Sequence, residues 1–172
     1  MFLKYIKNFG LKKIIKKSLA EYKPAALPGG VRTVGVIIDE SSFKEKEALL
    51  QTLIKHGIKN ENIETLSFKE SLGSKEVPDC CYYTRSHISA NGSFTKEDAA
   101  AFISKPFDLL ISYYDFDKPA LAIATIQSAA GFKAGFATVD NRLNALVIHS
   151  VTERYDEFTE ELFKYLKNLN KI

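Results

Sequence analysis

Tryptophan is absent from this chain of 172 residues, and methionine occurs only at residue 1. The two cysteines, Cys80 and Cys81, are adjacent, and no spaced set of Cys and His residues accompanies them. Neighbouring cysteines rarely form a disulfide because the required geometry is strained, and a structural zinc site needs spaced Cys or His ligands. The sequence therefore predicts no metal site, and two thiols without a secretory signal indicate a reducing compartment.

Long hydrophobic runs are also missing. No stretch approaches the roughly 20 apolar residues of a membrane-spanning helix. Lysines interrupt the N-terminus every three or four residues, so it lacks the apolar core of a secretory signal. We therefore expect a cytoplasmic protein. Its hydrophobic fraction of 45% and charged fraction of 26% are ordinary for a globular protein, and its length suits one domain.

Charge is divided unevenly along the chain. Residues 1–24 carry seven lysines, one glutamate and no arginine, whereas residues 25–172 have a net charge of −3. A block of one sign is an electrostatic handle for phosphates or anionic surfaces. We therefore predict a basic helical arm, residues 1–24, followed by a single domain, residues 25–172.

The basic arm has two amphipathic patterns. At about 100° per residue, Phe2, Leu3, Tyr5, Ile6 and Phe9 fall mainly on one side of a helix, opposite Lys4 and Lys7. Leu11, Ile14, Ile15 and Leu19 share another face, opposite Lys12, Lys13, Lys16 and Lys17. The two apolar faces lie nearly half a turn apart, and Gly10 stands between them. Because glycine bends or breaks helices easily, we expect two short segments hinged at Gly10.

The six lysines of these segments have two interpretations. They are either a solvated outer face of helices that pack on the domain, or a binding surface for a polyanion. In the second case the partner is RNA, a ribosomal particle or an anionic membrane surface. The absence of arginine, which grips phosphate bidentately, weakens the RNA interpretation. Pairing through Phe2, Ile6 and Phe9 would also suit a homodimer.

The rest of the chain alternates between strand and helix patterns. We expect strands at residues 31–38, 63–68, 107–113, 133–138 and 145–149, a further strand within 78–83, and a linker at 24–30. Helices are expected from Ser42 to Gly57, from Thr95 to Phe102, from Lys118-Pro119 to Gly131 and over 155–169, with Asn91-Gly92 as a turn. Their caps are predicted to be Ser42 with Glu45, Thr95 with Asp98, and Asp115 or Asp117. The alternation predicts an α/β fold, a three-layer sandwich with a mostly parallel, Rossmann-like sheet.

The glycines do not form a phosphate-binding loop. Gly29-Gly30 precedes the first expected strand, whereas the nucleotide-binding glycine motifs follow one. We therefore expect no nucleotide cofactor.

Polar residues follow several of the expected strands. Ligands of open parallel sheets sit beyond the carboxyl ends of the strands, and that rule selects Asp39, Asp115 and His149 as candidate catalytic residues. Two carboxylates and an imidazole would suit either the binding of a cation or acid–base chemistry. The alternative is that these acidic residues are helix caps or solvated loop residues. A nucleophilic Cys80 or Cys81 with His87 as its base lacks an orienting third group, so a buried structural cysteine is the better interpretation.

Two stretches carry a resemblance. The first is Phe107–Ile111 followed by Lys118-Pro119, Ala122 and Ala129–Phe136, and the second is the basic N-terminus leading to Val34–Asp39. Together they resemble a family of small proteins of unknown function from Bacteroidota, which implies a fold but no activity. The strand–helix–strand unit is also similar to one Rossmann-like half of heptosyltransferase-type glycosyltransferases, without the half that binds the nucleotide-sugar.

Two functions follow as hypotheses. The first is a non-enzymatic α/β module that its basic arm tethers to RNA, a ribosome or an anionic surface. The second is a small-molecule binder or glycosyltransferase-like enzyme that uses the carboxylates at the strand ends.

Overall fold

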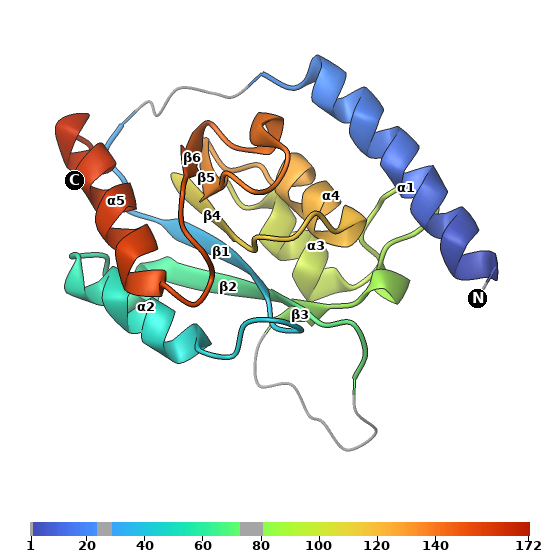
Figure 1. The fold of residues 1–172 in the computed structure, drawn as a ribbon, viewed down its shortest axis with the longest axis horizontal. Coiled ribbons are helices and arrows are strands. Elements are labelled where there is room, and N and C mark those ends of the chain that lie inside the picture. The colour runs from blue at the N-terminus through green and yellow to red at the C-terminus, as the bar shows by residue number, and fades with distance from the viewer. Residues whose placement is uncertain (1, 24–28, 73–80) are drawn as a thin grey trace.

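A computed structural model describes residues 2–23, 29–72 and 81–172, with the backbone alone for residues 2–8. Within these residues six strands form one sheet, and every strand pair is parallel. The strands are β1 (Val34–Asp39), β2 (Ile63–Phe68), β3 (Tyr82–Tyr83), β4 (Leu109–Tyr113), β5 (Phe132–Phe136) and β6 (Leu146–Ile148). The α-helices are α1 (Phe2–Glu21), α2 (Lys46–Lys55), α3 (Glu97–Ser104), α4 (Pro119–Gln127) and α5 (Tyr155–Asn168) (Figure 1). The predicted α/β architecture with an N-terminal helix is confirmed.

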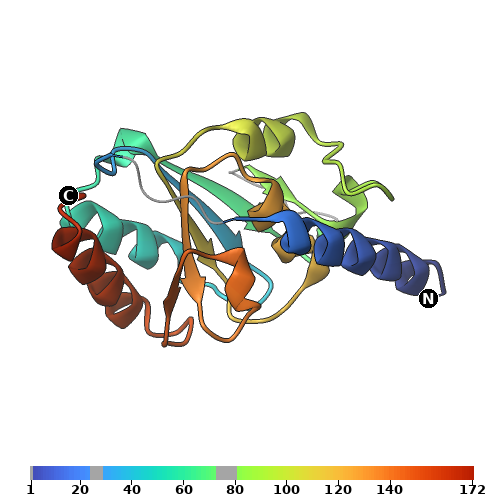
Figure 2. The same ribbon diagram turned by 90° about the horizontal axis from the view of Figure 1, so that it is seen from above.

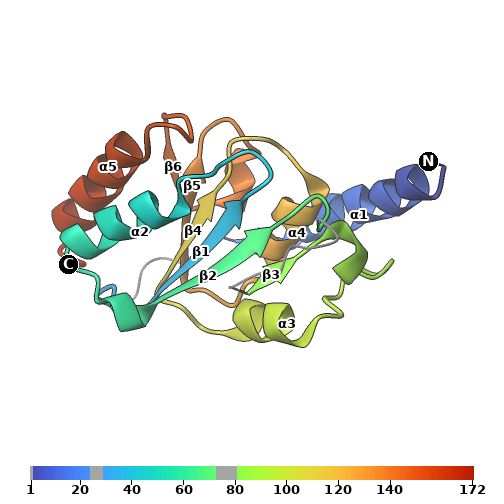
Figure 3. The ribbon, with the colours of Figure 1, turned by 90° about the horizontal axis from the view of Figure 1, so that it is seen from below.

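The helices cover both faces of the sheet. Helices α2 and α5 lie together on one face, and α1, α3 and α4 lie on the other (Figure 3). Each face has its own hydrophobic core: Leu53 and Phe158 belong to the first, and Leu11, Phe102 and Leu121 to the second. The molecule is therefore a three-layer sandwich, as the alternation of strands and helices predicts.

The strand order is β3-β2-β1-β4-β5-β6. From β1 the chain adds β2 and β3 toward one edge of the sheet. It then returns to the centre, where β4 pairs with β1, and adds β5 and β6 toward the other edge. In doubly wound sheets with this order, ligands bind outside the carboxyl ends of the strands where the direction reverses. That position lies between β1 and β4, and we call the ends of β1, β2 and β4 with the loops that follow them the carboxyl edge.

The central strands are buried along their whole length. Every residue of β1, β4 and β5 is buried, which explains their nearly continuous apolar runs. Gly35 in β1 has a specific packing role, because a Cβ there would lie 2.6 Å from the ring of Phe107. The glycine therefore lets that ring pack directly on the strand.

Helix α1 runs through Gly10 without interruption, so the predicted hinge between two segments is wrong. Glycine costs a helix only about 1 kcal/mol relative to alanine. Residues on both sides of Gly10 favour the helix, and the second half is anchored by tertiary packing. The N-terminal turns of α1 extend beyond the rest of the molecule (Figure 2).

The second half of α1 packs on α4. Leu11 and Leu19 are buried in the core of that face, and Ile14 and Ile15 pack against it. Residues 11–22 of the predicted arm are therefore part of the molecule's packed surface, whereas the division into an arm, 1–24, and a domain, 25–172, stays a prediction. The start and the end of the predicted domain also lie together, because the Val31 amide donates a hydrogen bond of 2.7 Å to the Lys171 carbonyl.

The predicted helix caps are wrong, because their side chains are used elsewhere. Helices α2, α3 and α4 begin after Glu45, Lys96 and Lys118, none of which caps through its side chain. Ser42 and Thr95 instead donate to the carbonyls of Asp39 and His87, and Asp115 accepts from Thr152. Helix α4 also ends at Gln127 rather than at Gly131.

Other local predictions are confirmed. Gly57 ends α2 with a φ of 100°, and Pro119 occupies the first turn of α4. Gly92 takes a φ of 87° in the turn after Asn91, where Ser89 bonds to Ser93. Most of the linker expected at residues 24–30, and Cys80, lie outside the described residues.

Candidate functional site

The exposed side of α1 carries four lysines: Lys12, Lys13, Lys16 and Lys17, which we call the lysine face. It lies opposite buried Leu11 and spans roughly 7.5 Å of helix axis. Within the described part of the chain, none of the four ammonium groups is paired with a carboxylate. The side chains of Lys4 and Lys7 are outside the described residues, and their part in a polyanion site stays a prediction.

An aromatic side chain adjoins the lysine face. Phe9 is 74% exposed, the largest value among the large apolar side chains described. It precedes Lys12 and Lys13 by three and four residues, a spacing that places side chains next to one another on a helix. An exposed aromatic ring therefore lies one turn before Lys12 and Lys13, at the start of the lysine face.

A buried lysine lies between the end of α4 and Tyr22, the residue that follows α1. Lys133 in β5 is 2% exposed, and its Nζ donates to the carbonyls of Thr125 and Ile126 at the end of α4 over 2.7 and 3.3 Å. The same Nζ lies 4.9 Å from the ring centre of Tyr22, just after α1. Burial lowers the pKa of Lys133 to about 8. Sequence reasoning missed this role, although a lysine inside a buried strand was a visible signal.

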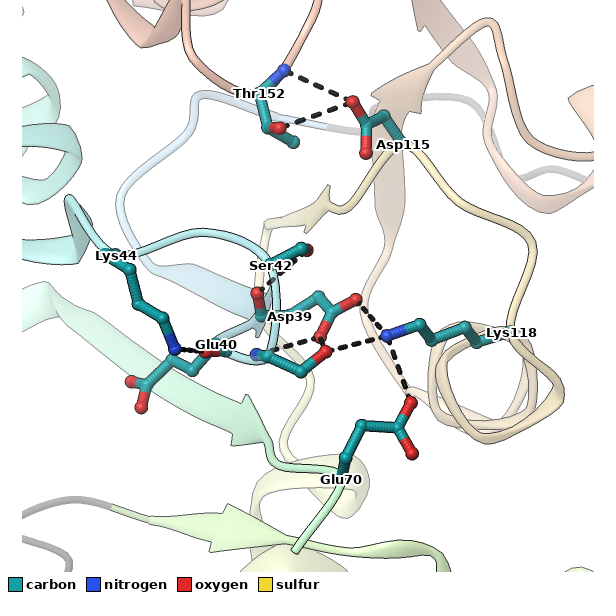
Figure 4. Close-up of polar contacts among 9 residues, drawn as sticks. Asp39, Glu40, Ser42, Lys44, Glu70, Asp115, Lys118 and Thr152 are labelled. Carbon is teal, nitrogen blue, oxygen red and sulfur yellow. Dashed lines mark hydrogen bonds and ion pairs between the residues drawn. The ribbon is translucent and has the colours of Figure 1, made fainter.

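At the carboxyl edge, Asp39 is held by two partners (Figure 4). Its side chain is 1% exposed, and its Oδ2 forms an ion pair of 2.8 Å with Lys118 Nζ. Its Oδ1 accepts from the amide and the hydroxyl of Ser41. Lys118 also donates to Ser41 Oγ over 2.7 Å and pairs with Glu70 at 3.1 Å. One ammonium therefore joins the loops after β1, β2 and β4.

The charges of this group determine its protonation. Burial alone would lower the pKa of Lys118, but the hydrogen bond and attraction from Asp39, with a weaker effect of Glu70, raise it above its ordinary value. The Lys118 ammonium is therefore fixed as a cation between two acids. The rule that selected Asp39 applies equally to Lys118, which also follows a strand, but its place before Pro119 suggested only a helix start.

Glu40 forms a second charged group next to Asp39. It pairs with Lys46 and Lys69 at 3.0 and 3.3 Å and accepts from Ser67 Oγ at 2.6 Å. Burial raises the pKa of the Glu40 carboxyl, but the bonds from Ser67 and Lys46 outweigh burial and leave the pKa below its ordinary value.

A cavity of about 530 Å³ opens beside these residues at the ends of β1 and β2. Lysines, glutamates and serines share its lining with one aromatic ring: Glu40, Ser41, Phe43, Lys44, Lys46, Glu47, Lys69, Glu70 and Ser71. The lining carries as many acids as lysines, so it has no net charge.

The three predicted catalytic residues lie at the same end of the sheet but have separate surroundings. Asp115 follows β4 and accepts from the amide and hydroxyl of Thr152 at 3.5 and 3.3 Å, away from the partners of Asp39 (Figure 4). His149 is exposed and lines a different cavity of about 440 Å³ between β6 and α5. Neither Asp39 nor Asp115 lines that cavity. A catalytic role for the three residues stays a prediction.

Neither a metal-binding cluster nor a membrane-spanning helix occurs among the described residues. In this part of the chain no group of three or more His, Cys, Asp or Glu side chains is arranged to hold a metal ion. No described helix combines the length and apolar character needed to cross a membrane. Cys81 is half-buried and packs against the core beneath α1 and α4.

Comparison with known proteins gives a family but no activity. No curated protein and no solved structure matches the chain significantly. A family described as "Family of unknown function (DUF6913)" matches residues 7–169, a span that includes the lysine face, the whole sheet and the carboxyl edge. The chain therefore belongs to this family of unknown function, DUF6913.

Proposed function

We propose that this protein is a non-enzymatic docking module that binds a polyanionic partner through the lysine face of α1. The observation that carries the proposal is the division of α1 into a buried apolar side and an exposed side whose four lysines pair with no acid among residues 9–23, 29–72 and 81–172. A charged helix face is often only solvated. This one differs because like charges sit one turn apart, at Lys12 and Lys16 and at Lys13 and Lys17, and such pairs destabilise a helix slightly.

The distribution of charge favours an oriented encounter. The basic block has a net charge of +6 and the remaining 148 residues a net charge of −3, from the printed sequence. An anionic surface attracts the first and repels the second, so approach with α1 foremost is preferred. The carboxyl edge supports the non-enzymatic part of the proposal, because Asp39 and Asp115 are engaged in internal contacts.

Charge removal is a better test than truncation. Deleting α1 would uncover the apolar surface of α4 that Leu11 and Leu19 cover. We therefore suggest changing Lys12, Lys13, Lys16 and Lys17 together to glutamine in the full chain, and measuring retention on heparin as the salt concentration rises. A matched control changes four exposed lysines near the other face of the sheet, Lys55, Lys59, Lys164 and Lys167.

The proposal predicts that the wild type elutes late, that the lysine-face variant elutes much earlier and that the control variant stays close to the wild type. Binding of polyanions by lysine releases counterions, so affinity falls steeply with salt. Equal elution of the two variants would refute the proposal.

A second candidate is a small-molecule binder with a Rossmann-like sheet, similar to one half of a glycosyltransferase. It is favoured by the cavity of about 530 Å³, which lies on the side of the sheet where such folds bind ligands. A ligand that binds only the folded state raises the melting temperature. We would screen sugar phosphates and nucleotide-sugars for a rise that Ser41→Ala and Lys44→Met reduce. No rise with any compound would count against this candidate.

The remaining expectations stay predictions: a cytoplasmic location, an origin in Bacteroidota, and a homodimer through Phe2, Ile6 and Phe9. Analytical ultracentrifugation tests the homodimer directly.

A further inference from the structure

We infer that the polyanionic partner of α1 is an anionic membrane surface, on which α1 lies flat with Phe9 inserted among the lipid headgroups. This inference rests on the proposed function and names the partner. It starts from the exposed ring of Phe9, which a purely electrostatic surface does not need and which is 74% exposed beside Lys12 and Lys13.

The chemistry of the surface favours lipid over RNA. All the basic residues in 1–24 are lysines, whose compact charge suits headgroup phosphates. The segment has no arginine, whose forked guanidinium suits bidentate contacts. Sites for single-stranded RNA combine a positive groove with aromatic rings on which bases stack. Here the charges lie on the convex outer side of a helix. Such a surface fits a flat membrane better than it fits a single RNA strand, which needs a groove.

The position of α1 leaves this surface accessible. The helix lies at the periphery, and its first turns extend past the body (Figure 2). Leu11 and Leu19 are already committed to the packing on α4. Among the described side chains, the outer side of α1 therefore offers Phe9 as its apolar contact and the four lysines as its charges. This combination suits binding in the interfacial region of a membrane.

The lysines and Phe9 are expected to contribute differently to membrane affinity. Each lysine close to an anionic surface strengthens binding by roughly fivefold, so four together contribute on the order of several hundredfold. Partial burial of one phenylalanine contributes about tenfold. Neither contribution alone gives stable attachment, in line with the general need for two signals. Lysine changes should therefore abolish binding, whereas loss of Phe9 should weaken it.

The experiment is flotation of the full chain with phosphatidylcholine vesicles that contain phosphatidylglycerol, and with vesicles of pure phosphatidylcholine. The variants are Phe9→Ala, the four lysine-face glutamine changes, and Tyr165→Ala as an aromatic control. Tyr165 is 39% exposed on α5, on the opposite face of the sheet. Single-stranded and double-stranded RNA are titrated in parallel by fluorescence anisotropy.

The inference predicts binding to the anionic vesicles alone, a loss of about tenfold with Phe9→Ala, no change with Tyr165→Ala and no binding with the lysine-face variant. Binding to RNA without binding to vesicles would overturn the inference and leave the proposed function standing. Binding to neither would refute both. Vesicle binding that Phe9→Ala leaves unchanged would overturn the insertion of Phe9 and with it the inference.

Discussion

The lysine face of α1 and the carboxyl edge of the sheet both concentrate charged side chains, but the two regions differ in whether those charges are paired. At the carboxyl edge, Lys118 lies between Asp39 and Glu70, and Glu40 lies between Lys46 and Lys69. On α1, four lysines face solvent, and none of them forms an ion pair with an acid in the described part of the chain. Charges that are paired internally support the fold, and charges left unpaired are free to bind a partner. The comparison supports the proposal that the first region stabilises the fold and that the second binds a partner.

The largest expected effect on stability is at the carboxyl edge. Asp39→Asn removes the buried charge that holds Lys118 and the loop at Ser41. Breaking a buried ion pair is costly, and Glu70 compensates only in part. We expect the free energy of unfolding to fall by about 3 kcal/mol, measured by urea denaturation at neutral pH. The exposed acid Asp156, changed to Asn, is the control. A loss similar to that of the control would show that the carboxyl edge does not support the fold.

A test beneath α1 uses the pKa of Lys133, which burial lowers to about 8. The unfolded chain keeps this proton up to about pH 10.4, so above pH 8 the unfolded state binds more protons than the folded state, and stability rises with pH. We expect a rise of about 2 kcal/mol between pH 8 and about 9.5. Lys133→Met should remove that rise. Higher pH is avoided because burial raises the pKa of Tyr83 and Tyr114, which opposes the effect there. A rise of equal size in both proteins would show that Lys133 is not its source.

Glu40 gives a smaller effect in acid. Because its folded pKa lies below the ordinary value, its contribution is present above the unfolded pKa and is lost as the pH falls through the folded pKa. Glu40→Gln should lower stability by about 1 kcal/mol at neutral pH, and the gap to the wild type should close as the solution is acidified. Urea unfolding across the acid range measures the gap. A gap that stays constant with pH would refute ionic pairing as its cause.

The smallest effect on stability is expected at the lysine face, and it has the opposite sign. Changing Lys12, Lys13, Lys16 and Lys17 to glutamine relieves two like-charge pairs one turn apart. We expect a gain of about 0.5 kcal/mol, seen as a slightly higher melting temperature at low salt. A clear loss of stability would mean that these lysines support the fold, and the contrast between the two regions would fail.

The strands and the apolar face of α1 formed by Leu11, Ile14, Ile15 and Leu19 could be predicted because they depend on local pattern. Buried parallel strands such as Val34–Asp39 are apolar throughout, and Leu11, Ile15 and Leu19 repeat at helical spacing. The hinge at Gly10 could not be judged in this way, because packing of the following turns on α4 outweighs a glycine's small local cost.

The sequence alone could not predict the helix caps or the bonding partners of the candidate-site residues, for a related reason. Ser42, Thr95 and Asp115 are suitable cap residues, but Ser42 bonds within its own loop to Asp39, and Thr95 and Asp115 bond to the more distant His87 and Thr152. The strand-end rule did locate Asp39 and Asp115 at one edge. It could not show that Lys118, 79 positions beyond Asp39 in the printed numbering, would reach back to that carboxylate.

Helix α4 gives the molecule a mechanical connection between its two charged regions. It is nine residues long, about 13 Å of rigid rod, and a lysine secures each end. At the start of α4, Lys118 forms an ion pair with Asp39 at the end of β1. At its end, Lys133 donates to the Thr125 carbonyl beside the ring of Tyr22. Helix α1 rests along the same rod. Helix α4 therefore links the packing of α1 physically to the loop after β1, which lines the cavity of about 530 Å³.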